Sequence, residues 1–423
     1  MNHAEAISPE AAKRPAAMRF IMLTVLIDMI SIGLIIPVLP VLVGTFTSSK
    51  SEQSYWYMAV TFAFGIANFF GSPILGALSD RFGRRPVLLL GFCGLAINFF
   101  ATALSTALWM LVAVRLVGGA MQSNIAVANA YVADITPPED RARRFGLLGA
   151  MFGVGFILGP MLGGILGEGN PHRPFFVAGG LALVNLCYGY FVLPESLPAD
   201  KRRPFEWSRA NPVNALSALT RLQGAGPLVA VLAFTGLAQF ILYTTWVLYT
   251  SFKFGWTPFQ NGVSLAVVGV VSVIVQGVLL GRLLKRFSPQ RLATIGLVSS
   301  ALAYLAYGAA PEGWMMYGII VLNFLGFTVA ASFQSIISSA AGADVQGQTM
   351  GSVSSLNSLM SVLAPLLGPP LLAVVSHLPQ GDWRIGTPFY LGSALQFVGL
   401  VLAIVHFRGQ RRHRLASQAG TTA

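Results

Sequence analysis

Charged residues are scarce in this sequence. Only 10% of its 423 residues are Asp, Glu, Lys or Arg, whereas 55% are hydrophobic and the mean hydropathy is +0.68. A soluble globular domain carries about a quarter charged residues, so the composition indicates an integral membrane protein instead. The two cysteines both fall in predicted membrane spans, so neither a disulfide framework nor a cysteine metal site is indicated.

Acidic residues are scarcer than basic ones, 15 against 27, which gives a formal net charge of +12. The placement of the basic residues argues against a nucleic-acid surface. If both termini are cytoplasmic, 22 Lys and Arg fall in cytoplasmic segments, 4 fall on the opposite side, and Arg115 lies within a span. Arg and Lys are retained on the inner side of a membrane. The sequence therefore predicts two cytoplasmic termini, an even number of spans and location in the inner (plasma) membrane.

Twelve apolar runs are long enough to cross a bilayer, which takes roughly 20 residues per helix. The predicted spans are 20–46, 54–78, 86–106, 108–133, 143–167, 173–194, 227–252, 258–283, 290–310, 313–341, 347–376 and 386–407. The first run is interpreted as a span and not as a removed signal peptide. The polar stretch between the two sets predicts a cytoplasmic linker at 195–226. It joins a bundle at 1–194 to a bundle at 227–423, which ends in a basic cytoplasmic tail.

An internal repeat at an offset of 205 residues supports this division. The segment Ile74–Phe82 aligns without a gap to Leu279–Phe287, and the same offset carries Leu158–Gly163 onto Leu363–Gly368. Parallel repeats related by an axis along the membrane normal are a known construction of transporters. We therefore expect an all-α membrane protein with two pseudo-symmetric bundles of six helices.

Two ionisable residues lie deep in the predicted spans, Asp28 in the first and Arg115 in the fourth. Ionisable side chains inside a bilayer are costly and usually functional. Asp28 is a candidate proton carrier, whereas Arg115 keeps its charge at any biological pH and would act on a partner. Asp28 is one candidate partner. The alternatives are a structural carboxyl near the aqueous edge and an arginine that reaches the headgroups.

Two glycine-rich motifs stand out. The segment Gly76-Ala-Leu-Ser-Asp80-Arg81-Phe-Gly83-Arg84-Arg85 lies between the second and third spans. It resembles the signature loop of the major facilitator superfamily. The resemblance implies a gating loop in which Asp80 anchors to a helix end near Gly347 and stabilises the outward-facing state. The second motif, in the fifth span, consists of Gly155, Gly159, Pro160, Gly163 and Gly164, and it resembles the motif of proton-driven antiporters. Small residues at this spacing also let helices pack closely.

Longer stretches resemble the tetracycline/proton antiporter group of this superfamily. They are residues 28–40, 79–90, 107–111, 131–136, 145–167 and 171–176. The sequence departs from that group at three positions that are titratable in the pumps, where it carries Asn98, Ser272 and Ser300. Side chains of Asn and Ser form hydrogen bonds but do not titrate near neutral pH. The resemblance implies an exporter of tetracycline-like or other amphipathic molecules that exchanges its substrate for protons through Asp28.

Uncharged polar residues within the spans are the candidate substrate ligands. They are Gln122, Asn124, Gln239, Tyr243, Gln276 and Asn357. Such residues suit an amphipathic organic substrate, although helix packing would also account for any one of them. A proton-coupled or facilitated transporter of a sugar or other metabolite is the alternative function. A membrane enzyme or receptor is disfavoured, because the sequence has no Walker loop, no histidine cluster and no nucleophile elbow. We expect no cofactor, no metal and no nucleic-acid partner, and a monomer.

Overall fold

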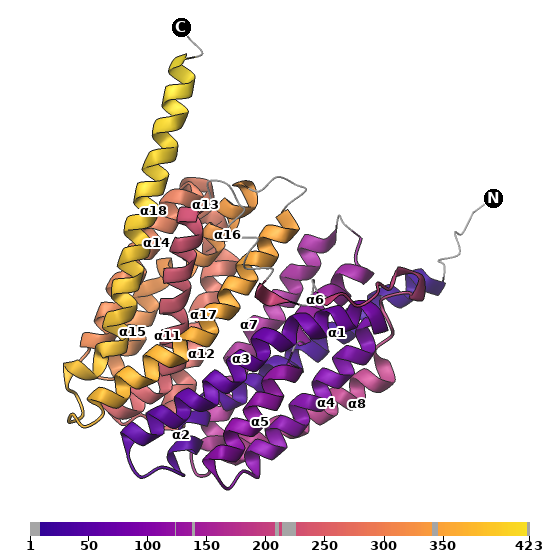
Figure 1. Cartoon of the computed structure of the whole chain (residues 1–423), viewed down its shortest axis with the longest axis horizontal. Helices are drawn as coiled ribbons and strands as arrows, with labels where there is room; N and C mark the ends of the chain where they lie inside the picture. The colour runs from indigo at the N-terminus through magenta and orange to yellow at the C-terminus, as the bar shows by residue number, and fades with distance from the viewer. Residues whose placement is uncertain are drawn as a thin grey trace. The chain divides into compact units, whose positions relative to one another are not determined.

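The computed structural model describes residues 9–122, 124–137, 140–207, 211–213, 226–340 and 346–420. Within these ranges the chain is helical and contains no strand. Its first part comprises α1 (Pro9–Ile35), α2 (Leu39–Gly44), α3 (Lys50–Phe82), α4 (Arg84–Ala103), α5 (Leu108–Met121), α6 (Asn124–Ile135), α7 (Arg141–Gly167), α8 (Arg173–Val192) and the short η2 (Ala199–Lys201). Figure 1 colours these helices from indigo to magenta.

The second part is similar in composition but has more interruptions. It comprises α11 (Gly226–Phe254), α12 (Pro258–Ile274), η3 (Val275–Leu279), α13 (Leu280–Arg286), α14 (Pro289–Ala309), α15 (Trp314–Leu322), η4 (Asn323–Thr328), α16 (Val329–Ala340), α17 (Gln346–Val375), η5 (Trp383–Gly386) and α18 (Thr387–Gly420). The turn η3 is π-helical and η4 is 3₁₀-helical, so two spans change their winding in mid-membrane. Winding defects of this kind often mark functional positions in helices.

Twelve helical segments of the described ranges are long and apolar enough to cross a membrane, which confirms the predicted fold class. Some spans are built from two helices. The first joins α1 to α2 across Pro37, because proline has no N–H to continue a helix. The fourth joins α5 to α6 across a break at Gln122. The last helix, α18, continues to Gly420, so the predicted basic tail extends the last span as a helix.

The chain divides into two compact units. The first contains residues Met1–Leu42, Ile66–Asn211 and Pro258–Ala266, and the second contains Val43–Gly65, Pro212–Thr257 and Val267–Ala423. Helices α3 and α12 thus each begin in one unit and end in the other. In the first unit α1 packs against α7 and α8, and in the second α18 packs against α11 and α14. The predicted boundaries at 194 and 226 stay a prediction, and 208–210 and 214–225 lie outside the described residues.

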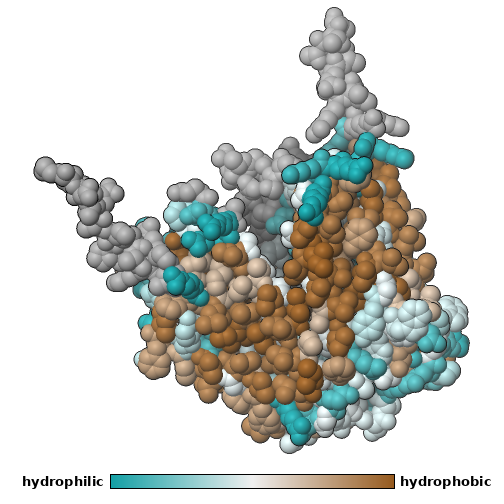
Figure 2. Space-filling model, turned by 180° about the vertical axis from the view of Figure 1, so that it is seen from behind, coloured by the Kyte–Doolittle hydropathy of each residue, from teal (hydrophilic) through white to brown (hydrophobic). Residues whose placement is uncertain are grey.

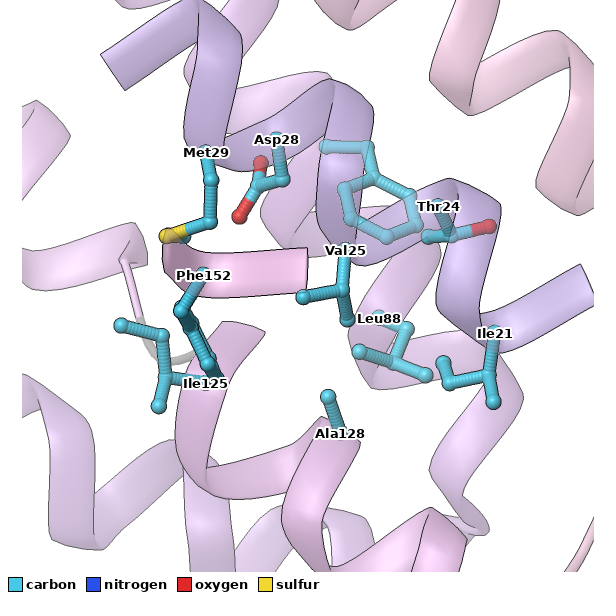
Figure 3. Close-up of a pocket in the computed structure, with 10 residues that line it drawn as sticks. Ile21, Thr24, Val25, Asp28, Met29, Leu88, Ile125, Ala128 and Phe152 are labelled. Carbon is cyan, nitrogen blue, oxygen red and sulfur yellow. The ribbon is translucent and has the colours of Figure 1, made fainter. Parts of the chain in front are cut away.

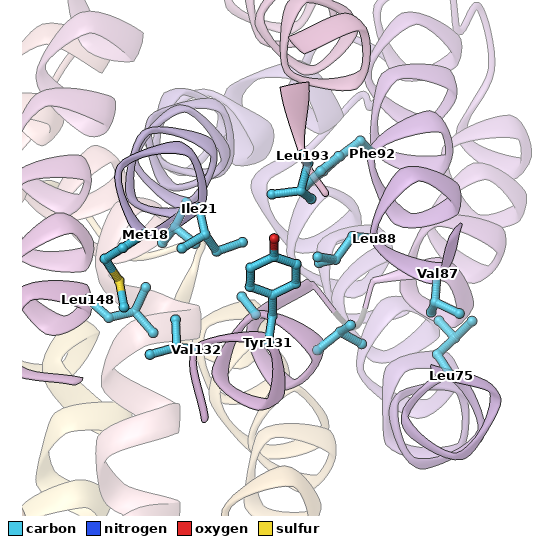
Figure 4. Close-up of a cluster of buried hydrophobic side chains, with 13 residues drawn as sticks. Met18, Ile21, Leu75, Val87, Leu88, Phe92, Tyr131, Val132, Leu148 and Leu193 are labelled. Atoms are coloured by element: carbon cyan, nitrogen blue, oxygen red, sulfur yellow. The ribbon is translucent and has the colours of Figure 1, made fainter. Parts of the chain in front are cut away.

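A buried apolar cluster fills the first unit around Tyr131. Figure 4 shows its ring among side chains that include Ile21, Leu88 and Val132. Tyr131 is fully buried, and its hydroxyl donates to the carbonyl of Pro194 at 2.9 Å. A buried tyrosine hydroxyl needs such a partner. The bond joins the inner part of α6 to the residues that follow α8.

Large apolar side chains also cover the outside of the helices. Leu322 and Phe191 are 77% and 80% exposed, and Figure 2 shows hydrophobic surface along the helices with hydrophilic residues toward their ends. A water-soluble monomer rarely exposes apolar patches of this extent. Lipid chains satisfy such a surface, so the molecule is a multi-pass membrane protein.

Glycines bring α7 into backbone contact with α1. A Cβ added at Gly33 of α1 would lie 2.8 Å from the Cα of Gly159 and 2.9 Å from the Cδ of Pro160. A Cβ added at Gly163 would collide with the backbone carbonyl of Leu34. Backbone atoms cannot move aside as a flexible side chain can. The two helices therefore depend on small residues at these positions.

Replacing Gly163 by alanine should separate α7 from α1 and lower the stability of the protein. We expect Gly163→Ala to cost about 1–3 kcal/mol through overpacking and to lower the thermal midpoint of the detergent-solubilised protein, measured by tryptophan fluorescence. Gly146→Ala is the matched control, because Gly146 lies on the same helix with nothing within 4 Å of an added Cβ. Equal midpoints for the two variants would contradict the packing role of Gly163.

Candidate functional site

Asp28 lies in a small pocket of the first unit. Its side chain comes from α1 and is 3% exposed. The pocket is lined by Ile21, Thr24, Val25, Asp28, Met29, Leu88, Phe92, Ile125, Ala128 and Phe152, which belong to α1, α4, α6 and α7. Figure 3 shows the carboxyl of Asp28 close to Met29. The predicted position of Asp28 deep in a span is thus matched by its burial.

Asp28 and Thr24 contribute the polar side chains of this pocket, and the other eight lining residues are apolar. An ionised carboxylate is costly in such surroundings. The cavity volume of about 10 Å³ is also far below the roughly 300–1,000 Å³ that holds a drug-sized ligand. The pocket therefore suits a titrating acid, and it does not enclose a whole drug molecule.

Arg115 lies on α5 and is 5% exposed. Its helix packs against α4, and none of the ten residues that line the Asp28 pocket comes from α5. Arg115 is therefore not a lining residue of that pocket, and pairing between it and Asp28 stays a prediction. Asn98 of α4 is 3% exposed and faces α5, because a Cβ added at Gly118 would lie 2.6 Å from the Cγ of Asn98. Gly118 follows Arg115 by one turn of α5, so the neutral Asn98 packs against the turn of α5 next to Arg115.

The signature loop turns sharply at Gly83, whose φ of +105° favours glycine. Arg84, which begins α4, is the centre of an ion-pair network. Its guanidinium pairs with Asp80, donates to Asp134 Oδ2 at 3.0 Å and donates to the hydroxyl of Ser79 at 2.6 Å. Arg84 is 9% exposed, so these partners compensate a largely buried charge.

The other predicted loop residues have lesser contacts within the structure. Arg81 is exposed and lies over the ring of Phe82, and Arg85 donates to the carbonyl of Tyr190 and lies over its ring. An added Cβ at Gly76 would meet nothing within 4 Å. The helix end near Gly347 belongs to the second unit, so the implied docking of Asp80 there stays a prediction.

Sequence reasoning missed Glu195, which was assigned only to the linker. Its carboxylate accepts hydrogen bonds from the backbone N–H groups of Arg84 at 2.8 Å and Arg85 at 3.2 Å. It also accepts from Ser196 and Leu197, both at 3.0 Å. An anion stabilises the free N–H groups and the dipole at a helix N-terminus. The available signal in the sequence was that Glu195 is the first acid after the sixth span. Its partners, the N–H groups of Arg84 and Arg85, lie more than 100 residues earlier in the chain.

The antiporter motif lies along the face of α7 that contacts its neighbours. Gly155 lies against Met29, and Gly159 lies against Gly33 beside Pro160, so this face supports the turns of α1 that carry Asp28. Gly164 faces the beginning of α12, where a Cβ would lie 2.7 Å from the carbonyl of Pro258. The motif therefore positions the candidate proton site through close helix packing.

Three of the four candidate substrate ligands of the second unit, Gln239, Tyr243 and Gln276, take part in side-chain hydrogen bonds. Gln239 donates to the hydroxyl of Tyr243 at 2.6 Å, and Gln276 of the π-helical turn donates to Ser272 at 2.6 Å. Asn357 of α17 faces Gly236, where an added Cβ would lie 3.5 Å from its Oδ1. Gly236 lies one turn before Gln239 on α11, so these α11 and α17 residues are neighbours.

Three further polar positions have different surroundings. The carbonyl of Gln122 accepts from Asn68 across the break between α5 and α6. The side chain of Asn124 lies outside the described residues. Ser300 is 6% exposed and lies near η4, because a Cβ added at Gly326 would be 2.6 Å from its hydroxyl. Ser300 is therefore buried against η4.

Twelve helical segments of the described ranges that can cross a membrane, and the buried acid Asp28 within the first of them, define a multi-pass membrane protein. The sequence model of the Major Facilitator Superfamily matches residues 21–365, so the chain belongs to that family. This confirms the fold class and the family predicted from the signature loop.

Tetracycline resistance proteins are among its relatives. The class C protein of Escherichia coli is 37% identical over 369 residues, which cover 87% of this chain and 93% of the relative. The class B protein of Escherichia coli is 34% identical and covers 86% and 91%. The resemblance to the tetracycline group is thereby confirmed, and the chain is a multi-pass transporter of the inner membrane.

Solved structures of transporters share the fold. The human organic anion transporter MFSD10 (TETRAN) is 24% identical, with a TM-score of 0.66 and coverage of 92% of this chain and 99% of that one. The nucleoside transporter NupG is 14% identical, with a TM-score of 0.74 and coverage of 92% and 99%. These similarities extend over nearly the whole length of each chain.

Removing the charge of Arg84 should destabilise the first unit. In Arg84→Gln, the carboxylates of Asp80 and Asp134 lose their shared cation, and we expect a cost of about 2 kcal/mol because the network is partly exposed. The thermal midpoint in detergent should fall by several degrees. Arg81→Gln, which changes an exposed arginine of the same loop, should leave it unchanged. Equal effects of the two substitutions would contradict the central place of Arg84.

Proposed function

We propose that this transporter exports an amphipathic small molecule, tetracycline-like or another drug, in exchange for protons by alternating access. It acts as a monomer with both termini in the cytoplasm. The observation that carries the proposal is the burial of Asp28 in a pocket of the first unit whose other lining residues, apart from Thr24, are apolar. Because a proton neutralises this carboxyl, protonation changes the cost of burying it. Access to the two sides of the membrane can thereby be coupled to proton binding.

Arg115 acts in the same process without carrying the proton. A guanidinium stays charged at biological pH, so it can stabilise an ionised carboxylate or hold backbone carbonyls in place. Its burial on α5 and the neighbouring Asn98 support a fixed positive charge in the first unit. The neutral Asn98 leaves Asp28 as the acid of the described spans that we assign to proton coupling.

The proposed substrate class rests on the scarcity of acids in the second unit. The acids in its described residues are Glu52, Glu312 and Asp382, near helix ends and in connecting segments. Gln239, Tyr243, Gln276 and Asn357 instead offer hydrogen bonds beside apolar surface. The tetracycline resistance relatives support a drug of similar character. The neutral residues Ser272 and Ser300 favour a substrate range that differs from theirs.

Proton exchange in everted membrane vesicles tests this function. A proton gradient is imposed and followed with a fluorescent pH probe while tetracycline or one of a panel of amphipathic cations and neutral drugs is added. We expect proton release on adding an exported compound, and none in Asp28→Asn, because the amide cannot carry a proton. Glu312→Gln, which changes an exposed acid, is the matched control and should behave as wild type.

The outcomes separate the candidate functions. A response to tetracycline identifies a tetracycline exporter, and a response only to other compounds identifies a drug exporter of different specificity. Full gradient-driven transport by Asp28→Asn would refute the role of Asp28. No response to any compound of the panel would contradict drug export and favour a sugar or metabolite transporter.

A further inference from the structure

Two buried polar atoms near the turn of α1 that precedes Asp28 have no hydrogen-bond partner in the structure. They are the hydroxyl oxygen of Thr24, which is 1% exposed, and the amide oxygen of Asn185, which is fully buried. Buried polar groups are nearly always paired, so each such atom calls for an explanation. Thr24 also lines the Asp28 pocket, one turn earlier on α1 (Figure 3).

Asn185 is held next to the same turn of α1. It comes from α8, which packs against α1, and its Nδ2 donates to the carbonyl oxygen of Thr24 at 2.9 Å. In an α-helix this carbonyl also accepts the N–H of the residue four positions later, which is Asp28. Figure 3 shows the carboxyl of Asp28 on the side of Met29. Because side chains of a helix lean toward its N-terminus, rotation of Asp28 can bring its carboxyl toward the turn where Thr24 and Asn185 meet.

We propose that Thr24 and Asn185 form a hydrogen-bond switch that reads whether Asp28 is protonated, an inference that rests on the proposed role of Asp28 as proton carrier. A hydroxyl both donates and accepts, whereas the amide oxygen only accepts. When Asp28 is ionised, the Thr24 hydroxyl donates to its carboxylate. When Asp28 is protonated, its O–H donates to Thr24, which then donates to the amide oxygen of Asn185.

The switch needs the side chains of Thr24 and Asp28 to rotate toward each other. Figure 3 shows the Thr24 hydroxyl pointing away from the carboxyl of Asp28. Threonine divides between two χ1 rotamers in helices, and rotation between them redirects the hydroxyl. The protonation state of Asp28 on α1 is thereby transmitted to α8. The C-terminal end of α8 is followed by Glu195, which contacts the signature loop. Both residues are positioning residues and do not carry the proton themselves.

Other titratable groups on the elements around Asp28 do not line its pocket. Those toward the helix ends are Arg19, Arg84, Arg85, Asp134, Arg141, Arg143, Arg144, Arg173 and Tyr190, and those within the spans are Cys93, Arg115, Tyr131, Cys187 and Tyr188. The hydroxyl of Tyr131 is bound to Pro194. In this proposal the protonation of Asp28 is read by Thr24, which lines the pocket, and by Asn185, which is bound to the same turn of α1.

Carbodiimide labelling of Asp28 in the purified protein tests the switch. Carbodiimides react with protonated carboxyls, so labelling measured by mass spectrometry across pH gives the pH of half-labelling. Thr24→Val removes the donor to the carboxylate and should raise this pH by about half to one unit, because hydrogen bonds to a charged group are stronger. Thr24→Ser should restore the wild-type value. Asn185→Leu removes the acceptor used by the protonated state and should lower it.

Thr235→Val is the matched control, since Thr235 is a buried threonine of another span that bonds only its own helix. Shifts in opposite directions for Thr24→Val and Asn185→Leu would support the switch, because loss of structure alone would not produce them. An unchanged half-labelling pH in both variants would overturn it while the proposed function stands. Labelling of wild-type Asp28 that does not vary with pH would overturn both.

Discussion

The structure depends on placing one carboxyl group, Asp28, among apolar side chains inside a membrane protein. An ionised carboxylate in apolar surroundings is expensive, whereas its protonated form is much less so. The helices packed around Asp28 fix the position of its carboxyl and therefore the environment in which it must ionise. Glycines of α7 press directly on α1 at Gly33 and Leu34, so the turns that carry Asp28 are held at the shortest distance two helices allow.

A second set of contacts fixes α4, which is another of the helices that line the pocket. Leu88 and Phe92 line the pocket from α4, and α4 begins at Arg84, where Asp80, Asp134 and the capping carboxylate of Glu195 converge. The signature loop and the acid pocket thus share one helix. In this arrangement the loop is more than a topogenic turn, because its ion pairs fix the helix that forms one wall of the pocket.

The sequence predicted what depends on local composition. Twelve apolar runs and the uneven distribution of Arg and Lys were sufficient for the spans, and the scarcity of charge made Asp28 and Arg115 visible. The motifs identified the family. The partners were not predictable in the same way, because Glu195, Thr24 and Asn185 acquire their roles only through contacts between distant helices. The interruptions at η3 and η4 were also missed, since hydropathy does not report the winding of a helix.

The central claim, that substrate and proton are exchanged through Asp28, is tested most directly by proton release from purified protein in solution. Tetracycline, or another compound that the vesicles export, is added to the detergent-solubilised transporter in weak buffer, and released protons are measured with a pH indicator. The account predicts proton release by wild type and none by Asp28→Asn, although the variant still binds the compound. Equal proton release by both proteins would contradict it.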